Sequence, residues 1–196
     1  MSNSSVSKNL TSLEIQNFLT TNKKAISLMN QGTEDYAAAR CCLINGLFSG
    51  LPIAAQAVEK FLKANIYFLD PTYSKKRKHD LIALAKDLKD LEPSFPFEKY
   101  HILLLKLINY YEARYPENKN SATTSTALIY ELDPLMIYIA ETVPVPKEAK
   151  NFIEFYFWTN YSKRKKHPLN ILKKEHIWGL EKWLTENNHA LFLNSH

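Results

Sequence analysis

Residues 54–69 read AAQAVEKFLKANIYFL, and this stretch decides the fold class. Its apolar side chains recur three or four residues apart, which is the spacing of one helix face: Ala54, Ala57, Val58, Phe61, Leu62 and Phe68. Glu59 and Lys63 fall largely on the other side, at a favourable i,i+4 spacing for an ion pair. Pro52 suits the first turn of this helix, because an amide there would have no partner within the helix. The pattern predicts one helix that Asp70-Pro71 ends.

Nearly every other segment also predicts a helix, and no alternating strand pattern of useful length is present. Thr11 and Glu14 have the spacing of a capping box at the start of the first helix. Thr33 is expected to cap the second helix, and Gly50 to break it. The predicted helices cover about 11–30, 34–48, 80–91, 97–115, 126–141 (kinked or restarted at Asp133-Pro134), an aromatic stretch from 152, and a last stretch containing Trp178 and Trp183. The fold class is therefore expected to be all-α, an up-and-down helical bundle.

The short helix that Asp80 opens carries an apolar face of its own. Its side chains expected to point inward are Leu81, Leu84, Ala85, Leu88 and Leu91. An acidic residue at this helix start complements the positive end of the helix dipole.

Composition excludes several classes of site. The chain has 196 residues with four glycines, too few and too scattered for a glycine-rich phosphate loop. Its two cysteines, Cys41 and Cys42, are adjacent, which excludes a disulfide framework and a four-thiolate zinc site. We therefore expect no cofactor and no metal. The absence of a membrane-length apolar run and of a signal-peptide pattern favours a cytoplasmic protein that does not enter a membrane.

Positive charge is concentrated in two clusters, although the net charge is only +5. The first is Lys75, Lys76, Arg77 and Lys78; the second is Lys163, Arg164, Lys165 and Lys166. Local basic clusters suit a phosphate-bearing partner such as RNA or a nucleotide. The alternative reading, that each run is a solvated loop, stays open from charge alone.

Two single residues are candidates for chemistry. Arg114 continues the apolar stripe of 97–115 to its end, just before Pro116, so it needs an acidic partner, carbonyls, a second subunit or a ligand anion. His79 follows the first basic cluster, where it could bind a phosphate or move a proton. The alternative for His79 is that it supports the start of the helix after it.

Three stretches together resemble the HEPN family: residues 54–69, the His-Asp-Leu at 79–81, and LINYYEARYP at 107–116. The resemblance covers roughly residues 30–142. It implies a small α-helical bundle associated with nucleotide binding and RNA cleavage, often in toxin–antitoxin or defence systems, and a dimer with a shared cleft.

The chain departs from the ribonuclease members of that family in one respect. Those members carry an arginine, four to six further residues and then a histidine, which supply a cation and a proton-transfer group. Arg114 matches the arginine, but the histidine positions hold Lys119, Asn120 and Ser121. The resemblance therefore implies no metal-independent ribonuclease activity by the family mechanism.

We accordingly predict three parts: a lead-in and helix over 1–30, a HEPN-like bundle over 31–142, and a C-terminal helical extension with a basic loop over 143–196. The leading hypothesis is a non-catalytic module that binds RNA, a nucleotide or a partner protein, through Arg114 and the two basic clusters. One alternative is an active ribonuclease toxin with a rearranged site around Arg114 and His79; another is a structural homodimer without a ligand. The expected partners are a second copy of the chain, RNA or a nucleotide, and a nucleotidyltransferase partner protein.

Overall fold

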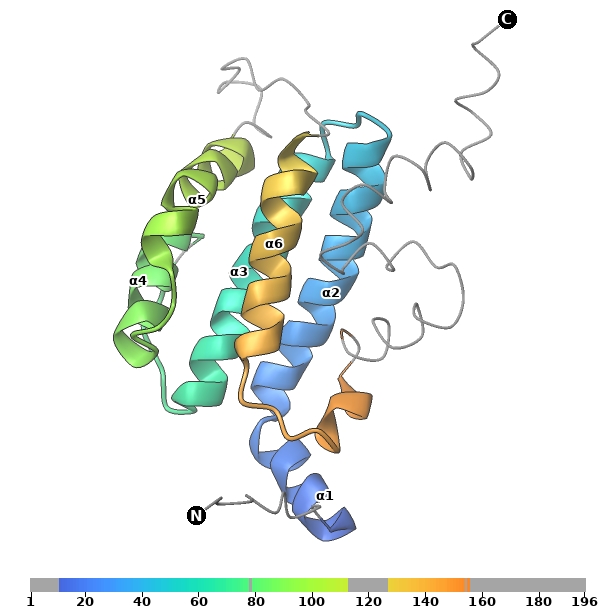
Figure 1. Cartoon of the computed structure of the whole chain (residues 1–196), viewed down its shortest axis with the longest axis vertical. Coiled ribbons are helices and arrows are strands. Elements are labelled where there is room, and N and C mark those ends of the chain that lie inside the picture. The colour runs from blue at the N-terminus through green and yellow to red at the C-terminus, as the bar shows by residue number, and fades with distance from the viewer. Residues whose placement is uncertain (1–10, 78, 113–126, 154, 156–196) are drawn as a thin grey trace, which may run out of the picture.

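The computed structural model describes residues 11–77, 79–112, 127–153 and 155, and over this part the chain forms six α-helices and no strand (Figure 1). The helices are α1 (Ser12–Thr21), α2 (Lys23–Ile44), α3 (Gly50–Leu69), α4 (Leu81–Leu91), α5 (Phe97–Glu112) and α6 (Ala127–Thr142), followed by the short 3₁₀ helix η2 (Ala149–Phe152). The predicted all-α bundle is confirmed.

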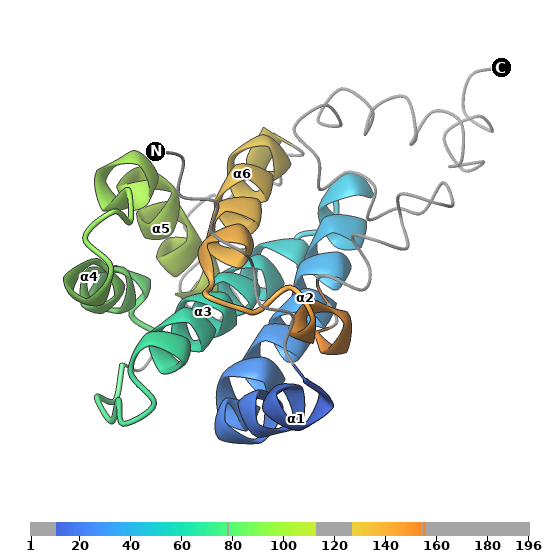
Figure 2. The ribbon, with the colours of Figure 1, turned by 60° about the horizontal axis from the view of Figure 1, so that its bottom comes forward.

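Helix α3 is the centre of the bundle. It contacts α2, α4, α5 and α6, which surround it in Figure 2. Four of its buried residues are alanines, at positions 54, 55, 57 and 64, and small side chains let neighbouring helices approach closely. Glu59, expected to be on the polar side, is 8% exposed and so lies at the edge of the core.

The N-terminal helices differ from the prediction in where they break. The capping box is confirmed, because the Thr11 hydroxyl accepts from the Glu14 amide and the Glu14 carboxylate accepts from the Thr11 amide. However, α1 ends at Thr21, and α2 continues through residues 30–33, where a break was expected. Thr33 is no cap: it is buried in mid-helix, and its hydroxyl donates to the Met29 carbonyl at 2.8 Å.

Gly32 explains why this stretch stays helical. A β-carbon at position 32 would lie 2.5 Å from a ring carbon of Phe61 on α3. Glycine therefore permits a close approach of α2 and α3 here, and their packing outweighs its poor helix propensity. The break expected at Gly50 is also wrong, because α2 already ends at Ile44 and Gly50 is the first residue of α3.

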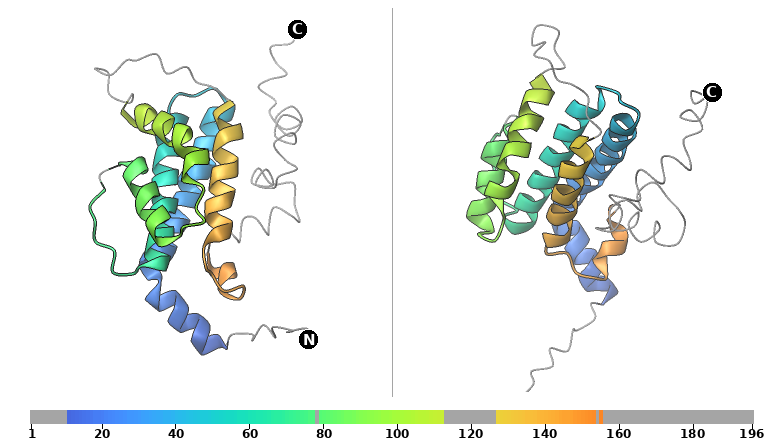
Figure 3. Two further views of the ribbon diagram at one scale, coloured as in Figure 1. Left: turned by 60° about the vertical axis from the view of Figure 1, so that its left-hand side comes forward. Right: turned by 45° about the horizontal axis from the view of Figure 1, so that its top comes forward.

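The linker between the end of α3 and the start of α4, described at residues 70–77 and 79–80, runs alongside the bundle in the left panel of Figure 3. Asp80 caps α4 as expected, accepting from the Ala83 amide at 2.9 Å. Four of the five side chains predicted to point inward are buried, but Leu91 is 39% exposed. It is the last residue of α4, and there the chain turns away towards α5.

Helix α6 contains Pro134 and is continuous from Ala127 to Thr142, so the helix does not restart at Asp133-Pro134. Proline removes one backbone hydrogen bond. Buried side chains on both sides of it, Leu132, Leu135, Met136 and Ile139, hold the helix against the core.

The core continues past α6. Val143, Val145, Ala149, Ile153 and Phe155 are buried, and the Phe155 ring packs edge-on against Phe61 with centroids 5.7 Å apart. The predicted division at residue 143 stays a prediction, and the basic run 163–166 and the last predicted helix lie outside the described residues. In the part of the chain that is described, no helix has the length and apolar character to cross a membrane.

Candidate functional site

His79 directly precedes Asp80, the cap of α4, and contacts residues on α3 and α5. Its backbone has φ 55°, a left-handed conformation that non-glycine residues rarely adopt. Its Nδ1 lies 2.7 Å from Glu59 Oε2 on α3, and its Nε2 lies 3.0 Å from the Tyr111 hydroxyl on α5. The His79 and Tyr111 rings are stacked with centroids 4.4 Å apart. The side chain is nevertheless 52% exposed, so a polar ring is held in a fixed orientation at the surface.

The partners of His79 fix its protons. A carboxylate can only accept a hydrogen bond, so Nδ1 carries a hydrogen and donates a hydrogen bond to Glu59. In the neutral ring, Nε2 then accepts from the Tyr111 hydroxyl. Both ring nitrogens are engaged in this arrangement, which orients the imidazole but leaves no nitrogen to take a proton from a substrate. His79 is not the helix cap either, because Asp80 has that role.

Glu59 is stable at the edge of the core because each of its oxygens has a cationic or donor partner. Oε1 accepts from the Lys63 ammonium, as the i,i+4 spacing predicted, and Oε2 accepts from His79. The contact with His79 joins residues twenty positions apart, so helical periodicity could not reveal it. The available signal was that both residues lie in the stretches carrying the HEPN resemblance.

A second carboxylate organises the linker. Asp87 on α4 accepts from the Tyr73 hydroxyl at 2.6 Å, from Lys75 Nζ at 2.9 Å, and from Arg77 Nε and Nη2 at 2.8 and 3.0 Å. The bonds from Arg77 hold the pKa of the Asp87 carboxyl far below its usual range, although burial opposes them. Burial and the bond to Asp87 raise the pKa of Tyr73 to about 12.

These contacts divide the predicted ligand-binding residues. Lys75 and Arg77 are engaged by Asp87, whereas Lys76 is exposed and has no partner among the described residues. Lys78, Arg114, Lys163, Arg164, Lys165 and Lys166 lie outside the described residues, so their binding roles stay predictions. Of the two catalytic candidates, the structure therefore places His79 only.

Comparison with known families agrees with the helical bundle. The family model described as HEPN domain matches residues 25–155, about two thirds of the chain. The chain belongs to the HEPN domain family. This places it among nucleotide- and RNA-associated helical modules, as the sequence resemblance implied. A comparison with curated proteins found no match, and a comparison with solved structures found none either.

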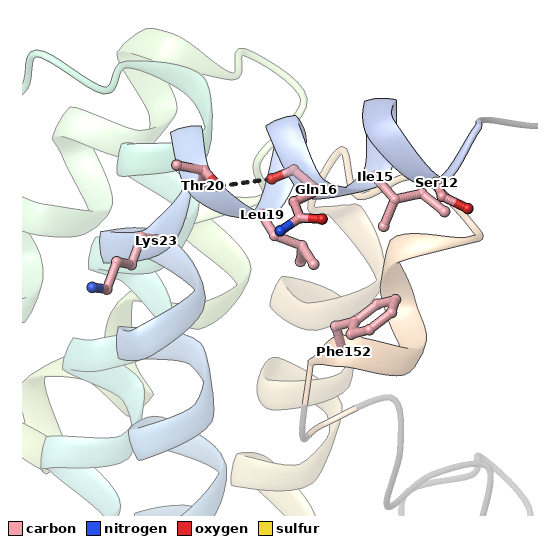
Figure 4. A pocket seen from close by; sticks show the side chains of 7 residues that line it. All are labelled: Ser12, Ile15, Gln16, Leu19, Thr20, Lys23 and Phe152. Atoms are coloured by element: carbon pink, nitrogen blue, oxygen red, sulfur yellow. Dashed lines mark hydrogen bonds between the residues drawn. The ribbon is translucent and has the colours of Figure 1, made fainter.

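The match begins at Ala25 and ends at Phe155, so the HEPN domain includes η2, whereas α1 precedes it. An open groove of about 640 Å³ lies between these two elements (Figure 4). In that view the Phe152 ring faces the side of α1 that carries Ile15 and Leu19. Lys23 is the single ionisable residue among those lining it, so the groove offers no pair of an acidic and a basic side chain.

Inside the HEPN domain, sequence analysis missed a buried ionic cluster. Asp133 on α6 accepts from the Tyr36 hydroxyl and lies 3.1 Å from Arg40 Nε, both on α2. Arg40 is 3% exposed and Asp133 is fully buried. Burial raises the pKa of Asp133 and, together with the neighbouring carboxylate, raises that of Tyr36 well above its usual value. A cluster enclosed in this way holds α2 and α6 together and is not a surface for a ligand.

The described residues also contain no group of three or more histidine, cysteine, aspartate or glutamate side chains placed to hold a metal ion.

Proposed function

We propose that this HEPN domain binds a phosphate-bearing ligand, RNA or a nucleotide, on the surface around His79 without cleaving it. The observation that carries the proposal is the strained backbone of His79 beneath a half-exposed, fully oriented imidazole. Strain of this kind persists where the surrounding structure imposes it, and it concentrates at functional sites. Glu59 and Tyr111 provide that imposition from two helices.

The surface has the chemistry that such a ligand needs. Lys63, bound to the same Glu59, and the exposed Lys76 supply positive charge for phosphate groups. The stacked imidazole and phenol rings offer a flat face of the kind on which bases stack. These features support binding of a flexible single strand or a free nucleotide through shape and charge.

Two facts support binding without cleavage. Tyr111 engages the nitrogen of His79 that would act as a general base. In the ribonuclease members, four to six residues separate the arginine from the histidine. From Arg114 this spacing leads to positions 119–121, which hold lysine, asparagine and serine.

The decisive experiment is a titration of fluorescently labelled single-stranded RNA, and of ATP, with the wild-type chain and His79→Gly. Glycine accepts φ 55° without strain, so the relief of strain, about 1–2 kcal/mol, offsets the loss of two hydrogen bonds of about 1 kcal/mol each. The variant should unfold at nearly the wild-type temperature and bind about 5- to 160-fold more weakly, the range of one lost stacking contact.

Ser74→Gly is the matched control, because Ser74 is an exposed residue of the same linker. It should leave affinity unchanged. Equal affinities for wild type and His79→Gly would contradict the proposal.

A rearranged ribonuclease site is the second candidate, favoured by the Glu59–His79 pair, since a carboxylate that orients an imidazole is a common part of acid–base catalysis. In that case a rotation of Tyr111 would free Nε2. RNA cleavage in the presence of a chelator that survives in Tyr111→Phe and disappears in His79→Ala would establish it and remove the non-catalytic proposal.

The assembly is also a proposal. The family resemblance supports a homodimer, which light scattering would detect. A nucleotidyltransferase partner and a role in toxin–antitoxin or defence systems remain predictions from the family resemblance.

A further inference from the structure

The contacts of Asp87 follow an alternation along the linker. The carboxylate accepts from residues 73, 75 and 77, and it is itself 5% exposed. Side chains two residues apart point to the same side when the chain is extended. The polar ends of Tyr73, Lys75 and Arg77 therefore turn towards α4, although the Lys75 side chain is still 57% exposed, while Ser74 and Lys76 between them do not contact Asp87.

His79 is fixed separately, by contacts with Glu59 on α3 and Tyr111 on α5. The ends of the linker are fixed as well. Asp70 accepts from the Thr72 amide at 2.9 Å, and Asp80 caps α4. The path of the described linker residues, 70–77 and 79–80, is thus set by side-chain contacts in place of regular secondary structure.

We propose that Asp87 is a positioning residue that sorts the basic segment: it engages Lys75 and Arg77 and holds the chain so that the exposed Lys76 meets a phosphate group of the ligand. This inference rests on the proposed function. It assigns phosphate contact to Lys76, one of three described cations that the sequence alone treats as equivalent.

Asp87→Asn separates positioning from simple electrostatics, because the two predict changes in RNA affinity of opposite sign. The substitution removes a negative charge and releases two cations, so charge alone predicts tighter RNA binding. Positioning predicts weaker binding, because each side chain that must be ordered on association lowers affinity by about 2- to 12-fold. We expect weaker binding with the helical fold retained; tighter binding would overturn the inference.

Adjacent lysines provide a matched pair of equal charge. Log affinity falls with log salt concentration, and Lys76→Ala should make this slope shallower by about 0.7, the value for one phosphate contact on a single strand. Lys75→Ala should leave the slope unchanged. Equal changes in the two variants would show that the segment is not sorted.

Limited trypsin digestion tests the positioning without RNA, because Lys75, Lys76 and Arg77 are all cleavage sites. Wild type should be cut slowly there and Asp87→Asn at least about tenfold faster, since a protease needs a segment that opens locally. Should Asp87→Asn fail to fold, Tyr73→Phe removes one anchor without a change in charge and should show a smaller acceleration.

The two proposals fail in different ways. If wild type binds neither RNA nor ATP, the proposed function is wrong. If it binds but trypsin cuts wild type, Asp87→Asn and Tyr73→Phe at one rate, the positioning role of Asp87 is wrong and the proposed function stands.

Discussion

Asp87 and Asp133 are two buried carboxylates with similar partners. Each accepts from a tyrosine hydroxyl and pairs with an arginine four residues further along, Tyr73 and Arg77 in one case and Tyr36 and Arg40 in the other. Yet the pKa of Asp87 is lowered and that of Asp133 is raised.

Access to water accounts for the opposite directions. The cations around Asp87 lie at the rim of the fold, where the Arg77 side chain is 35% exposed and that of Lys75 is 57% exposed. Tyr36 and Arg40 are enclosed, so the ionised form of Asp133 loses more by leaving water than its partners return. A tyrosine and an arginine four residues apart thus form a partly exposed ion-pair cluster with Asp87 and a fully buried one with Asp133, where desolvation opposes ionisation.

The largest expected effect is the loss of one partner of the buried Arg40–Asp133 pair. Asp133→Ala should lower the free energy of unfolding by about 3–5 kcal/mol, because the Arg40 charge stays buried without its carboxylate. Urea unfolding followed by circular dichroism measures it.

The matched control replaces all three members of the cluster with apolar side chains, Arg40→Met and Tyr36→Phe with Asp133→Leu. Such replacements are often neutral or stabilising by up to about 4 kcal/mol. A triple variant as unstable as Asp133→Ala would mean that the cluster itself, and not the buried Arg40 charge that has lost Asp133, carries the stability.

The second effect is a pair of pH dependences with opposite sign. A carboxyl whose pKa is lowered on folding stabilises the fold above its unfolded pKa of about 3.9, and this contribution disappears as the pH falls below that value. The stability difference between wild type and Asp87→Asn should therefore shrink on acidification, by up to about 1.4 kcal/mol per pH unit.

For Asp133 the sign reverses. Its raised pKa favours the folded state at low pH, and this contribution is lost as the pH rises from about 3.9 through the folded pKa. Relative to Asp133→Asn, wild type should lose stability as the pH rises through that window. Urea midpoints between pH 3 and pH 7 give both differences, and parallel curves for the two variants would refute the contrast.

The smallest effect concerns the two tyrosines. Tyr73→Phe should cost about 0.5–1.5 kcal/mol, since Asp87 keeps its other donors. Tyr36→Phe should cost about 1–3 kcal/mol, because the enclosed Asp133 loses a donor that water cannot replace. Thermal unfolding ranks the stability losses of the two variants. A larger loss for Tyr73→Phe than for Tyr36→Phe would argue against placing Asp87 at the rim of the fold and Asp133 in its core.

Local patterns predicted the helices well where side-chain spacing and caps settle the matter. The stripe of α3, the Thr11 capping box and the Asp80 cap depend on residues within a few positions of one another. The break expected at 30–33 was wrong because glycine and threonine are poor helix formers, whereas the contact that keeps α2 helical is with Phe61 on another helix.

The same distinction applies to the site. Basic residues 75–78 and His79 could be selected from charge and motif. The sequence could not predict that Lys75 and Arg77 are paired while Lys76 is not, because this depends on Asp87 in the helix that follows the linker. Nor could sequence place Arg40 beside Asp133, since the two are 93 positions apart and neither belongs to a charge cluster.

The contact of Gly32 with Phe61 has a consequence for how the sequence can change. Alanine at position 32 would force the ring to move, and a smaller residue at 61 would leave a hole unless position 32 filled it. Positions 32 and 61 should therefore drift together among descendants of this chain, as one inherited unit, with glycine opposite phenylalanine or alanine opposite a smaller aliphatic residue, while either single exchange is selected against.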